Sequence, residues 1–351
     1  MLSASYPCLV ADVGGTNARF AWVASAGAPV SDIAVLPVHA HAGPAAAAQS
    51  YLAQLQISLG AGYQAPRRAA MAVATAVAGD RVELTNGHWS FSRQELQQAL
   101  GLDSLLVLND FEALALSLPR LQAGQLRPWP QASGVVEVVA PQATVQGLGQ
   151  GPASGPTLAV IGPGTGLGVA GVTRVRGEWV ALPGEGGHMT LAPGDAFESE
   201  LLAFVRRAYE HVSAERLLSG IGLPLLYSAV AAVRGAADLP AEAPALSAEV
   251  IVERGLARSD AHCEETLEVF CALLGGFAGN VALTLGARGG VFIGGGIVPR
   301  LGERFFASRF RERFEAKGRF RGYLADIPTA LITDTLAALG GAALALDQQH
   351  D

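Results

Sequence analysis

The order of hydrophobic and polar positions predicts strands alternating with helices. Short apolar runs that end at glycine turns or polar pairs indicate buried strands, and Ala- and Leu-rich stretches with capping residues indicate helices. The predicted strands lie at residues 8–11, 20–23, 71–77, 105–108, 158–161, 169–175 and 289–297, the last ending in a glycine turn, and residues 84–86 lead to a turn at Gly87. The predicted helices lie at residues 43–60, 92–101, 111–118, 197–218, 260–285 and 335–347. This alternation is typical of an α/β protein.

Two segments of the chain share one pattern of strand, glycine turn and strand. They are residues 8–24 and 158–175, about 150 residues apart, and they indicate a weak internal repeat. We therefore expect two related domains around a cleft. A dinucleotide-binding fingerprint needs a helix after its glycines, and none is predicted here. A P-loop needs a lysine after its glycines, and residues 14–17 are not followed by one.

Composition narrows the class of protein. The 351 residues are 50% hydrophobic and 16% charged, enough for two domains with sizeable cores. The net charge of −7 disfavours a nucleic-acid partner. Three cysteines cannot form a disulfide framework, and we expect Cys8, Cys263 and Cys271 to be buried as small hydrophobic residues. The uncharged stretch 138–173 is broken by Gly and Pro, and no leader pattern is visible, so we expect a cytoplasmic protein with no membrane span.

Three glycine-rich turns are candidate phosphate-binding loops. Consecutive backbone N–H groups in such turns can bind phosphate oxygens, although an ordinary hairpin turn or close packing also explains each turn taken alone. Asp12, at the end of the first strand, could hold a hydrated Mg²⁺. The candidate residues in the turns are Gly14, Gly15, Thr16, Asn17, Gly164, Thr165, Gly166, Gly294, Gly295 and Gly296.

Polar residues at strand ends and in a glycine-rich loop are candidates for substrate chemistry. Asn109 and Asp110 close a buried strand and open a helix, where helix capping is an alternative role. Glu185 and His188 share a loop and could clasp a small polyol, although a solvated loop is the alternative. Glu215 falls in a predicted helix, where a solvated face is the simpler interpretation. No Cys/His cluster has zinc spacing.

The order of these motifs resembles that of the bacterial glucokinase family, in the hexokinase and actin-like ATPase superfamily. The resemblance covers essentially the whole chain, and the set is specific although each motif alone is modest. It is similar to the family's zinc-free branch, because no cysteine cluster follows His188. The motifs are residues 12–19, 84–86, 108–111, 162–168, 182–188, 212–220 and 289–300.

The resemblance implies a fold, a reaction and a role for each candidate. It implies a two-domain actin-like fold with an interdomain cleft, a small domain of residues 1–118 completed by 333–351, and a large domain of residues 119–332. It implies ATP and Mg²⁺ as cofactor and metal and glucose as substrate, and it is compatible with a homodimer. Asp110 resembles the catalytic base, and a free aspartate, with a pKa near 3.9, is ionised at neutral pH. The implied glucose ligands are Asn109, Asp110, Glu185, His188 and Glu215.

Three features depart from the family pattern. The loop at 121–156 is longer than expected, Gly87-His88 replaces an expected His-Thr pair, and an expected Asn-Pro is missing from 334–340. We expect none of them to touch the residues proposed for chemistry. Two alternatives stay open: a kinase for another hexose on the same scaffold, and a non-catalytic sugar-binding regulator. The acidic charge and the short segment before the first strand disfavour a regulator that binds DNA.

Overall fold

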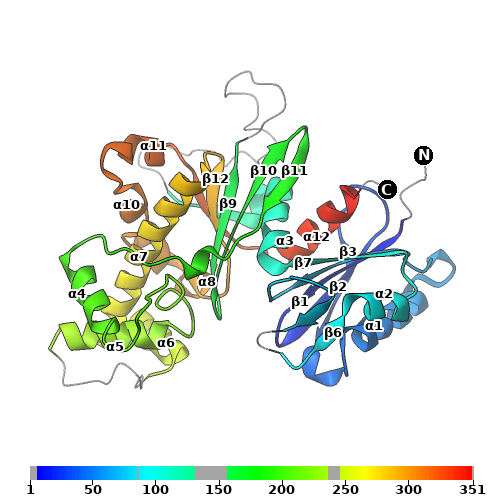
Figure 1. Ribbon diagram of the computed structural model, residues 1–351, viewed down its shortest axis with the longest axis horizontal. Helices are drawn as coiled ribbons and strands as arrows, with labels where there is room; N and C mark the ends of the chain where they lie inside the picture. Colours follow the sequence, from blue (N-terminus) through cyan, green and yellow to red (C-terminus); the bar gives the residue numbers. More distant parts are fainter. Residues whose placement is uncertain (1–5, 85–86, 131–155, 236–245, 350–351) are drawn as a thin grey trace. The chain divides into compact units, whose positions relative to one another are not determined.

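The chain forms two compact units, each with its own sheet and core (Figure 1). The computed structural model describes residues 6–84, 87–130, 156–235 and 246–349. The first unit comprises Met1–Leu121, Val175–Pro183 and Asp334–Asp351. The second unit comprises Gln122–Arg174 and Gly184–Thr333. Each sheet is flanked by helices, which confirms the predicted α/β class.

The first unit is built on a five-stranded sheet in the order β3-β2-β1-β4-β7. β1 pairs with β2 antiparallel and with β4 parallel, and β4 pairs with β7 parallel. The strands are β1 (Cys8–Val13), β2 (Asn17–Val23), β3 (Ser31–Pro37), β4 (Arg68–Val73) and β7 (Ser104–Asn109). A small separate hairpin pairs β5 (Arg81–Glu83) with β6 (Ser90–Ser92). The helices are α1 (Pro44–Leu59), α2 (Arg93–Ala99), α3 (Asp110–Ser117) and α12 (Ala337–Asp347).

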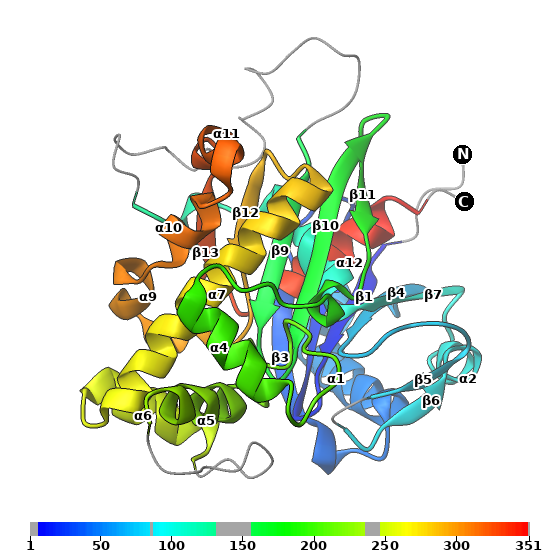
Figure 2. The ribbon, with the colours of Figure 1, turned by 60° about the vertical axis from the view of Figure 1, so that its left-hand side comes forward.

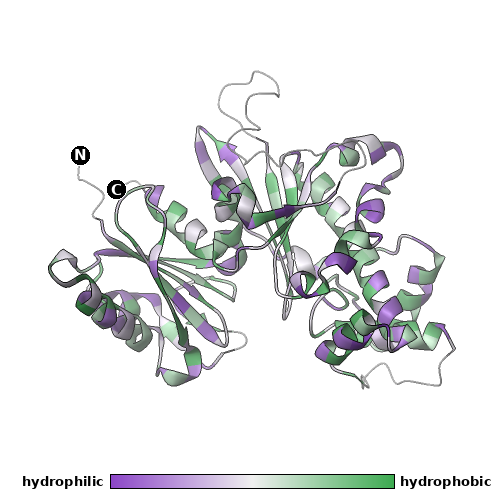
Figure 3. Ribbon diagram, turned by 180° about the vertical axis from the view of Figure 1, so that it is seen from behind, coloured by the Kyte–Doolittle hydropathy of each residue, from purple (hydrophilic) through white to green (hydrophobic). Residues whose placement is uncertain are grey.

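Both faces of this sheet are covered, because side chains alternate along its strands. Cys8 and Val10 of β1 pack in a cluster with Leu339 of α12. Leu9 of β1 packs in a second cluster with Tyr51 of α1. Strands buried on both faces have continuous apolar sequences, which explains why they could be predicted. Figure 3 shows hydrophobic residues along the central strands and polar residues on the outer helices.

The second unit repeats the pairing pattern of the first. Its six-stranded sheet has the order β11-β10-β9-β12-β13-β8, with β9 and β10 antiparallel and β9, β12 and β13 parallel. The predicted pair of hairpins is therefore confirmed, and each begins an equivalent set of strands. The strands are β8 (Leu126–Pro128), β9 (Leu158–Pro163), β10 (Leu167–Val175), β12 (Gly290–Ile293) and β13 (Thr329–Ile332). β10 turns at Arg176-Gly177 into β11 (Glu178–Leu182).

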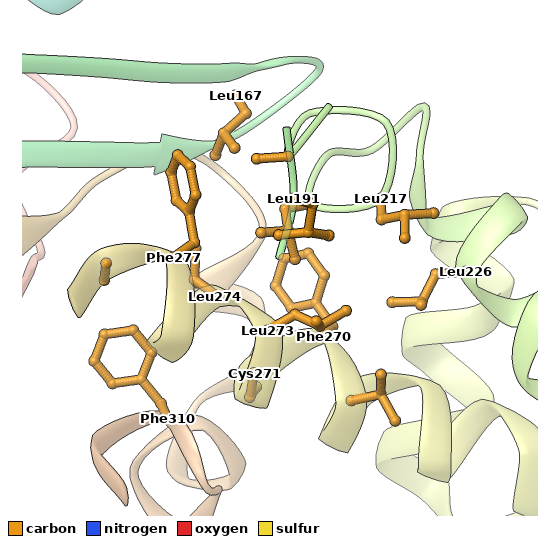
Figure 4. Packing of buried hydrophobic residues seen from close by; sticks show 14 of the residues in the cluster. Leu167, Leu191, Leu217, Leu226, Phe270, Cys271, Leu273, Leu274, Phe277 and Phe310 are labelled. Carbon is orange, nitrogen blue, oxygen red and sulfur yellow. The ribbon is translucent and has the colours of Figure 1, made fainter. Parts of the chain in front are cut away.

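The core of the second unit surrounds one long helix, α7 (Ala261–Leu285), which packs against α5, α6 and α10 (Figure 2). Phe270, Leu274 and Phe277 point from α7 into this core (Figure 4). By length and composition α7 could cross a membrane, but 78% of its apolar window is buried in the protein, so packing accounts for its composition. The other helices are α4 (Ala196–Val205), α5 (Leu223–Val233), α6 (Ala248–Ala257), α8 (Val298–Leu301), α9 (Glu303–Ala307), α10 (Phe310–Glu315) and α11 (Arg321–Ala325).

Most of the predicted elements are present, but one predicted helix is too long and one predicted loop contains a strand. The predicted helix 197–218 ends at Val205, because the chain beyond α4 bonds to a distant loop instead. The predicted loop 121–156 contains β8, whose buried Leu126 pairs with β13, while its residues 131–155 lie outside the described residues. Thr85 and Asn86, in the segment predicted to lead to a turn at Gly87, also lie outside them. The three cysteines are buried, as predicted.

The N-terminus of α7 gives a stability prediction. Asp260 caps this helix, its Oδ1 accepting hydrogen bonds from the amides of His262 at 2.9 Å and Cys263 at 3.0 Å. We expect Asp260→Ala to lower the free energy of unfolding by about 1 kcal/mol, because two amides lose their acceptor. Urea denaturation measures the change. Ser259→Ala is the control, and an equal loss in both variants would contradict the capping role.

Candidate active site

The parallel strands of the first unit end side by side, and the candidate residues lie at this edge. Val13 of β1 is in register with Val73 of β4, and Val73 with Asn109 of β7. Asp12 lies one position before Val13. Ligands of open α/β sheets bind outside the carboxyl ends of the strands. The sheet therefore brings Asp12, Asn109 and Asp110 to one edge.

Asn109 and Asp110 lie where β7 ends and α3 begins. Asn109, rather than Asp110, is the N-cap: its Oδ1 accepts from the Phe111 amide at 2.9 Å, and its Nδ2 donates to the Thr75 carbonyl at 3.1 Å. Asp110 is the first residue of α3, and its Oδ1 also lies 2.9 Å from the Phe111 amide. The rigid N-cap fixes the backbone from which Asp110 projects.

Helix α3 is itself held by close packing against α12. A Cβ on Gly341 of α12 would lie 1.7 Å from the Ala113 carbonyl oxygen, so the two helices approach as closely as glycine allows. The neighbouring Gly340 has open space around its Cβ position. This contact anchors the helix that begins with Asp110.

The first glycine turn connects β1 and β2. Its Gly14 amide donates to the Asn17 carbonyl at 3.0 Å, and the Thr16 carbonyl accepts from Val38 at 2.9 Å. The Gly14 amide therefore closes the turn. A phosphate bound here would use the amides of the residues between Gly14 and Asn17 and the exposed Thr16 hydroxyl.

Gly87, one of the departures from the family pattern, lies beside the glycine turn at residues 14–17. This corrects the expectation that no departure touches the residues proposed for chemistry. A Cβ on Gly87 would lie 3.4 Å from the Gly15 Cα. The expected family residue at this position is histidine, so the smaller Gly87 leaves more room beside the turn. The sequence could not reveal this contact, because 71 intervening positions separate the two glycines along the chain.

Asp12 lies at the end of β1, largely buried, and pairs with a single arginine. Its Oδ2 lies 2.9 Å from Nη1 of Arg19 on β2. Burial raises the pKa of the Asp12 carboxyl, and the Arg19 guanidinium acts in the opposite direction. A cation would further stabilise a carboxylate removed from water in this way. The described residues hold no group of three potential metal ligands, so the donor set fits a largely hydrated Mg²⁺ rather than a protein cage.

In the second unit, two glycine turns meet at the carboxyl ends of β9 and β12. The Gly164 amide donates to the Gly166 carbonyl at 2.9 Å, closing the turn after β9. The Gly294 amide donates to Ile161 at 2.8 Å, and the Ile297 amide donates to Pro163 at 3.1 Å. The backbone of residues 294–297 is therefore fixed against the start of the other turn.

Gly295 is required at this contact. Its φ is +76°, and a Cβ on it would lie 2.4 Å from the Pro163 carbonyl oxygen. We expect Gly295→Ala to lower the free energy of unfolding by about 2 kcal/mol, since L-residues disfavour left-handed backbone and the turn must shift. The matched control is Gly296→Ala, whose Cβ has open space and no positive φ. Thermal and urea unfolding would compare the two variants, and an equal effect would contradict the close-approach argument.

The predicted sugar ligands of the second unit lie in two segments that bond to each other. Glu185 precedes a short 3₁₀ turn, Gly186–His188, and its carbonyl accepts from the His188 amide at 3.0 Å. Nδ1 of His188 lies 3.9 Å from Oε1 of Glu215. The Glu215 amide donates to the Gly187 carbonyl at 2.9 Å. The structure thus brings His188 and Glu215 together from positions 27 residues apart.

Glu215 is not helical, contrary to the prediction. The segment after α4 bonds to the loop around residue 189: Leu191 donates to Val212 at 3.0 Å, and Ala214 donates to Met189 at 2.8 Å. These long-range backbone bonds outweigh the helical propensity of the segment, which instead turns at residues 213–218. Glu215 therefore lies beside the glycine-rich loop and not on a solvated helix face.

A cavity of about 360 Å³ lies against these residues within the second unit. Thr165, His188, Glu215 and Arg216 contribute to its wall. The Arg216 guanidinium is stacked over the Tyr209 ring, 4.4 Å from its centroid. The cavity therefore joins a residue of the second glycine turn to both acidic and basic side chains, as a polar ligand requires.

Comparison with known proteins identifies the family. The family model described as Glucokinase matches residues 9–349. A glucokinase of Aromatoleum aromaticum is 49% identical, over 98% of this chain and 96% of its own. A glucokinase of Chromobacterium violaceum is 46% identical, over 97% of this chain and 90% of its own. The chain belongs to the glucokinase family. The resemblance inferred from the ordered motifs is thereby confirmed.

Solved structures give the same fold. A glucokinase from an Antarctic psychrotroph has a TM-score of 0.82 and 35% identity, covering 98% of this chain and 99% of its own. A ROK-family glucokinase from Streptomyces griseus, in complex with glucose and AMPPNP, has a TM-score of 0.56 and 17% identity, covering 96% of this chain and 98% of its own. The hexokinase-like α/β fold is therefore shared by glucokinases much more distant than the curated relatives.

Several residues of this glucokinase-family site were missed by sequence reasoning. Arg19 pairs with Asp12 across the first hairpin, a pairing that the two-residue strand period could have indicated. Gly187 is needed for close approach, since its Cβ would lie 2.0 Å from the Leu167 carbonyl oxygen. Tyr209 and Arg216 line the cavity, and nothing in their local pattern marks them.

Proposed function

We propose that this chain transfers the γ-phosphoryl group of ATP to the 6-hydroxyl of glucose, with Asp110 as the general base. Membership in the glucokinase family over nearly the whole chain carries the proposal. The positions of Asp110 and of the three glycine turns support it, because each lies at the carboxyl end of a parallel strand in its own sheet, where ligands of such folds bind.

Asp110 is suited to accept the proton of the attacking hydroxyl. Phosphoryl transfer passes through a loose transition state, so catalysis consists mainly of positioning and charge stabilisation. The Asn109 cap and the α12 contact hold the start of α3, from which the Asp110 side chain projects. A fixed carboxylate loses little entropy when it meets the hydroxyl.

Asn109, Glu185, His188 and Glu215 are proposed to bind the remaining sugar hydroxyls. Each buried hydroxyl without a partner costs about 1–3 kcal/mol, so these contacts would discriminate between epimers. Two carboxylates and an imidazole can accept from hydroxyls, and the Asn109 amide can also donate. Asn109 already donates to Thr75 and accepts from Phe111, which leaves it one further N–H for a sugar oxygen.

The glycine turns are proposed to bind the donor phosphates. Their residues, Gly14 to Asn17, Gly164 to Gly166 and Gly294 to Gly296, offer backbone N–H groups without bulky side chains. Asp12 would hold a hydrated Mg²⁺ through its water ligands, and this ion would supply positive charge to the donor phosphates. Arg19 keeps the Asp12 carboxylate oriented at the edge of the sheet.

A hexose panel tests the substrate. With ATP and Mg²⁺, kcat/KM for glucose should exceed that for its 2- and 4-epimers, mannose and galactose, by at least about tenfold, the effect of one lost hydroxyl contact. A higher kcat/KM for another hexose would favour the alternative of a different sugar kinase. Binding of glucose with no turnover on any hexose would favour a non-catalytic sugar-binding protein. A homodimer and a cytoplasmic location stay predictions from the resemblance and from the sequence.

A further inference from the structure

One short segment of the second unit is bonded to both proposed substrate loops. Residues 213–222 contact the sugar loop through the amides of Ala214, which donates to Met189 at 2.8 Å, and Glu215, which donates to Gly187 at 2.9 Å. The same segment contacts the second glycine turn, because the Gly220 amide donates to the Gly164 carbonyl at 2.7 Å. The segment is therefore a physical connection between the two loops.

The Glu215 carboxylate adds a side-chain link to this connection. Its Oε2 accepts a hydrogen bond from the Leu167 amide at 2.8 Å, at the end of the second glycine turn. Its Oε1 faces the His188 ring at 3.9 Å. The side chain is about one-third exposed, so Oε1 can meet a hydroxyl while Oε2 stays on the backbone. One carboxylate thus has one oxygen on each loop.

Gly166 makes this link possible. A Cβ on Gly166 would lie 2.5 Å from Glu215 Oε2, closer than any real contact. A Cβ on Gly164, in the same turn, would meet nothing within 4 Å. Only one of these two glycines is therefore needed to admit the carboxylate.

We propose that Glu215 couples the sugar site to the phosphate turn, so that glucose raises the affinity for the nucleotide and the nucleotide raises the affinity for glucose. This inference rests on the proposed function. A sugar hydroxyl bound to Oε1 fixes the carboxylate, and the carboxylate then holds the Leu167 amide and the turn in one conformation. The first ligand to bind bears the entropic cost of ordering the Glu215 carboxylate and the turn, so the second ligand binds more tightly. The coupling must be equal in both directions.

Calorimetric titration of the full chain measures this coupling. The probe is AMPPNP with Mg²⁺, titrated with and without saturating glucose, and the coupling factor is the ratio of the two Kd values. Typical coupling lies at about 5–150-fold, and we expect at least fivefold in the unaltered protein. Gly166→Ala should bring the factor close to one. Gly164→Ala is the matched variant: it should keep the coupling factor even if its nucleotide Kd rises.

A second variant tests the same carboxylate without touching the turn. Glu215→Asp keeps the charge but is one methylene too short to span both loops, so its coupling factor should also approach one. The circular dichroism and melting temperature of each variant confirm that it is folded. Full coupling in Gly166→Ala or Glu215→Asp would overturn the proposal, and so would equal loss in Gly164→Ala or a factor of one in the unaltered protein. Failure of the proposed function is distinct, because glucose would then not be phosphorylated at all.

Discussion

Asp110→Asn is expected to lower kcat for glucose phosphorylation by about 10²–10⁴-fold, the range contributed by a positioned general base. The amide keeps the shape of the side chain and can still contact the sugar, but it cannot accept the proton of the 6-hydroxyl. Glucose Kd should therefore change much less than kcat. The helix start should be intact, because Asn109 and not Asp110 is the N-cap of α3. Steady-state kinetics and glucose titration measure the two quantities.

Asp103→Asn is a suitable control for this experiment. Asp103 lies just before β7 in the same unit and forms an exposed pair with Arg67, with more than half of each side chain accessible. Exposed pairs contribute at most about 1 kcal/mol, so this variant should fold and turn over like the unaltered protein. A kcat within tenfold of the unaltered value in Asp110→Asn would contradict the base assignment. Loss of glucose binding in a folded Asp110→Asn would instead assign Asp110 to sugar binding alone.

Glu198→Gln is expected to lower the free energy of unfolding by about 3–5 kcal/mol, the cost of removing one partner of a buried ion pair. Glu198 on α4 is 3% exposed, and its Oε2 lies 2.5 Å from Nη2 of Arg313 on α10. The same oxygen accepts from the Gly194 amide, in the segment that follows the sugar loop. The substitution leaves the Arg313 charge buried, and the Asp195 carboxylate, at 3.5 Å, does not replace the lost partner in full. Urea denaturation measures the loss.

A double variant separates the cost of leaving one charge unpaired from the free energy of unfolding that the ion pair itself contributes. Replacing both residues, as in Glu198→Met with Arg313→Met, removes both buried charges, and apolar replacements of buried pairs are often neutral. The double variant should therefore be more stable than Glu198→Gln. If Glu198→Gln costs less than about 1 kcal/mol, or if the double variant is the less stable, the unpaired charge is not the cause.

The parts of the fold that could be predicted depend on local pattern. β1 and β9 are buried on both faces, so their apolar runs are continuous and end visibly at glycine turns. The long helix α7 begins after Asp260 and ends before Gly286, which has the left-handed conformation. Asp260 is recognisable in the sequence as a helix start and Gly286 as a helix stop. The repeated hairpin follows from the same local signals.

The parts that could not be predicted depend on contacts between distant positions. Glu215 looked helical because its neighbours favour a helix, but backbone bonds to residues 187 and 189 decide its conformation. The closeness of Gly87 to Gly15 and of Gly341 to Ala113 has no local signature either. Long-range contacts of this kind override weak local propensities, and they also assemble the candidate site.

The most direct test of the central claim is ³¹P NMR of the purified protein with glucose, ATP and Mg²⁺. The account predicts that ATP is consumed only when glucose is present, with one ADP and one glucose 6-phosphate formed for each ATP. Formation of ADP and inorganic phosphate without a sugar phosphate would contradict it. So would the absence of any ATP consumption by the folded protein.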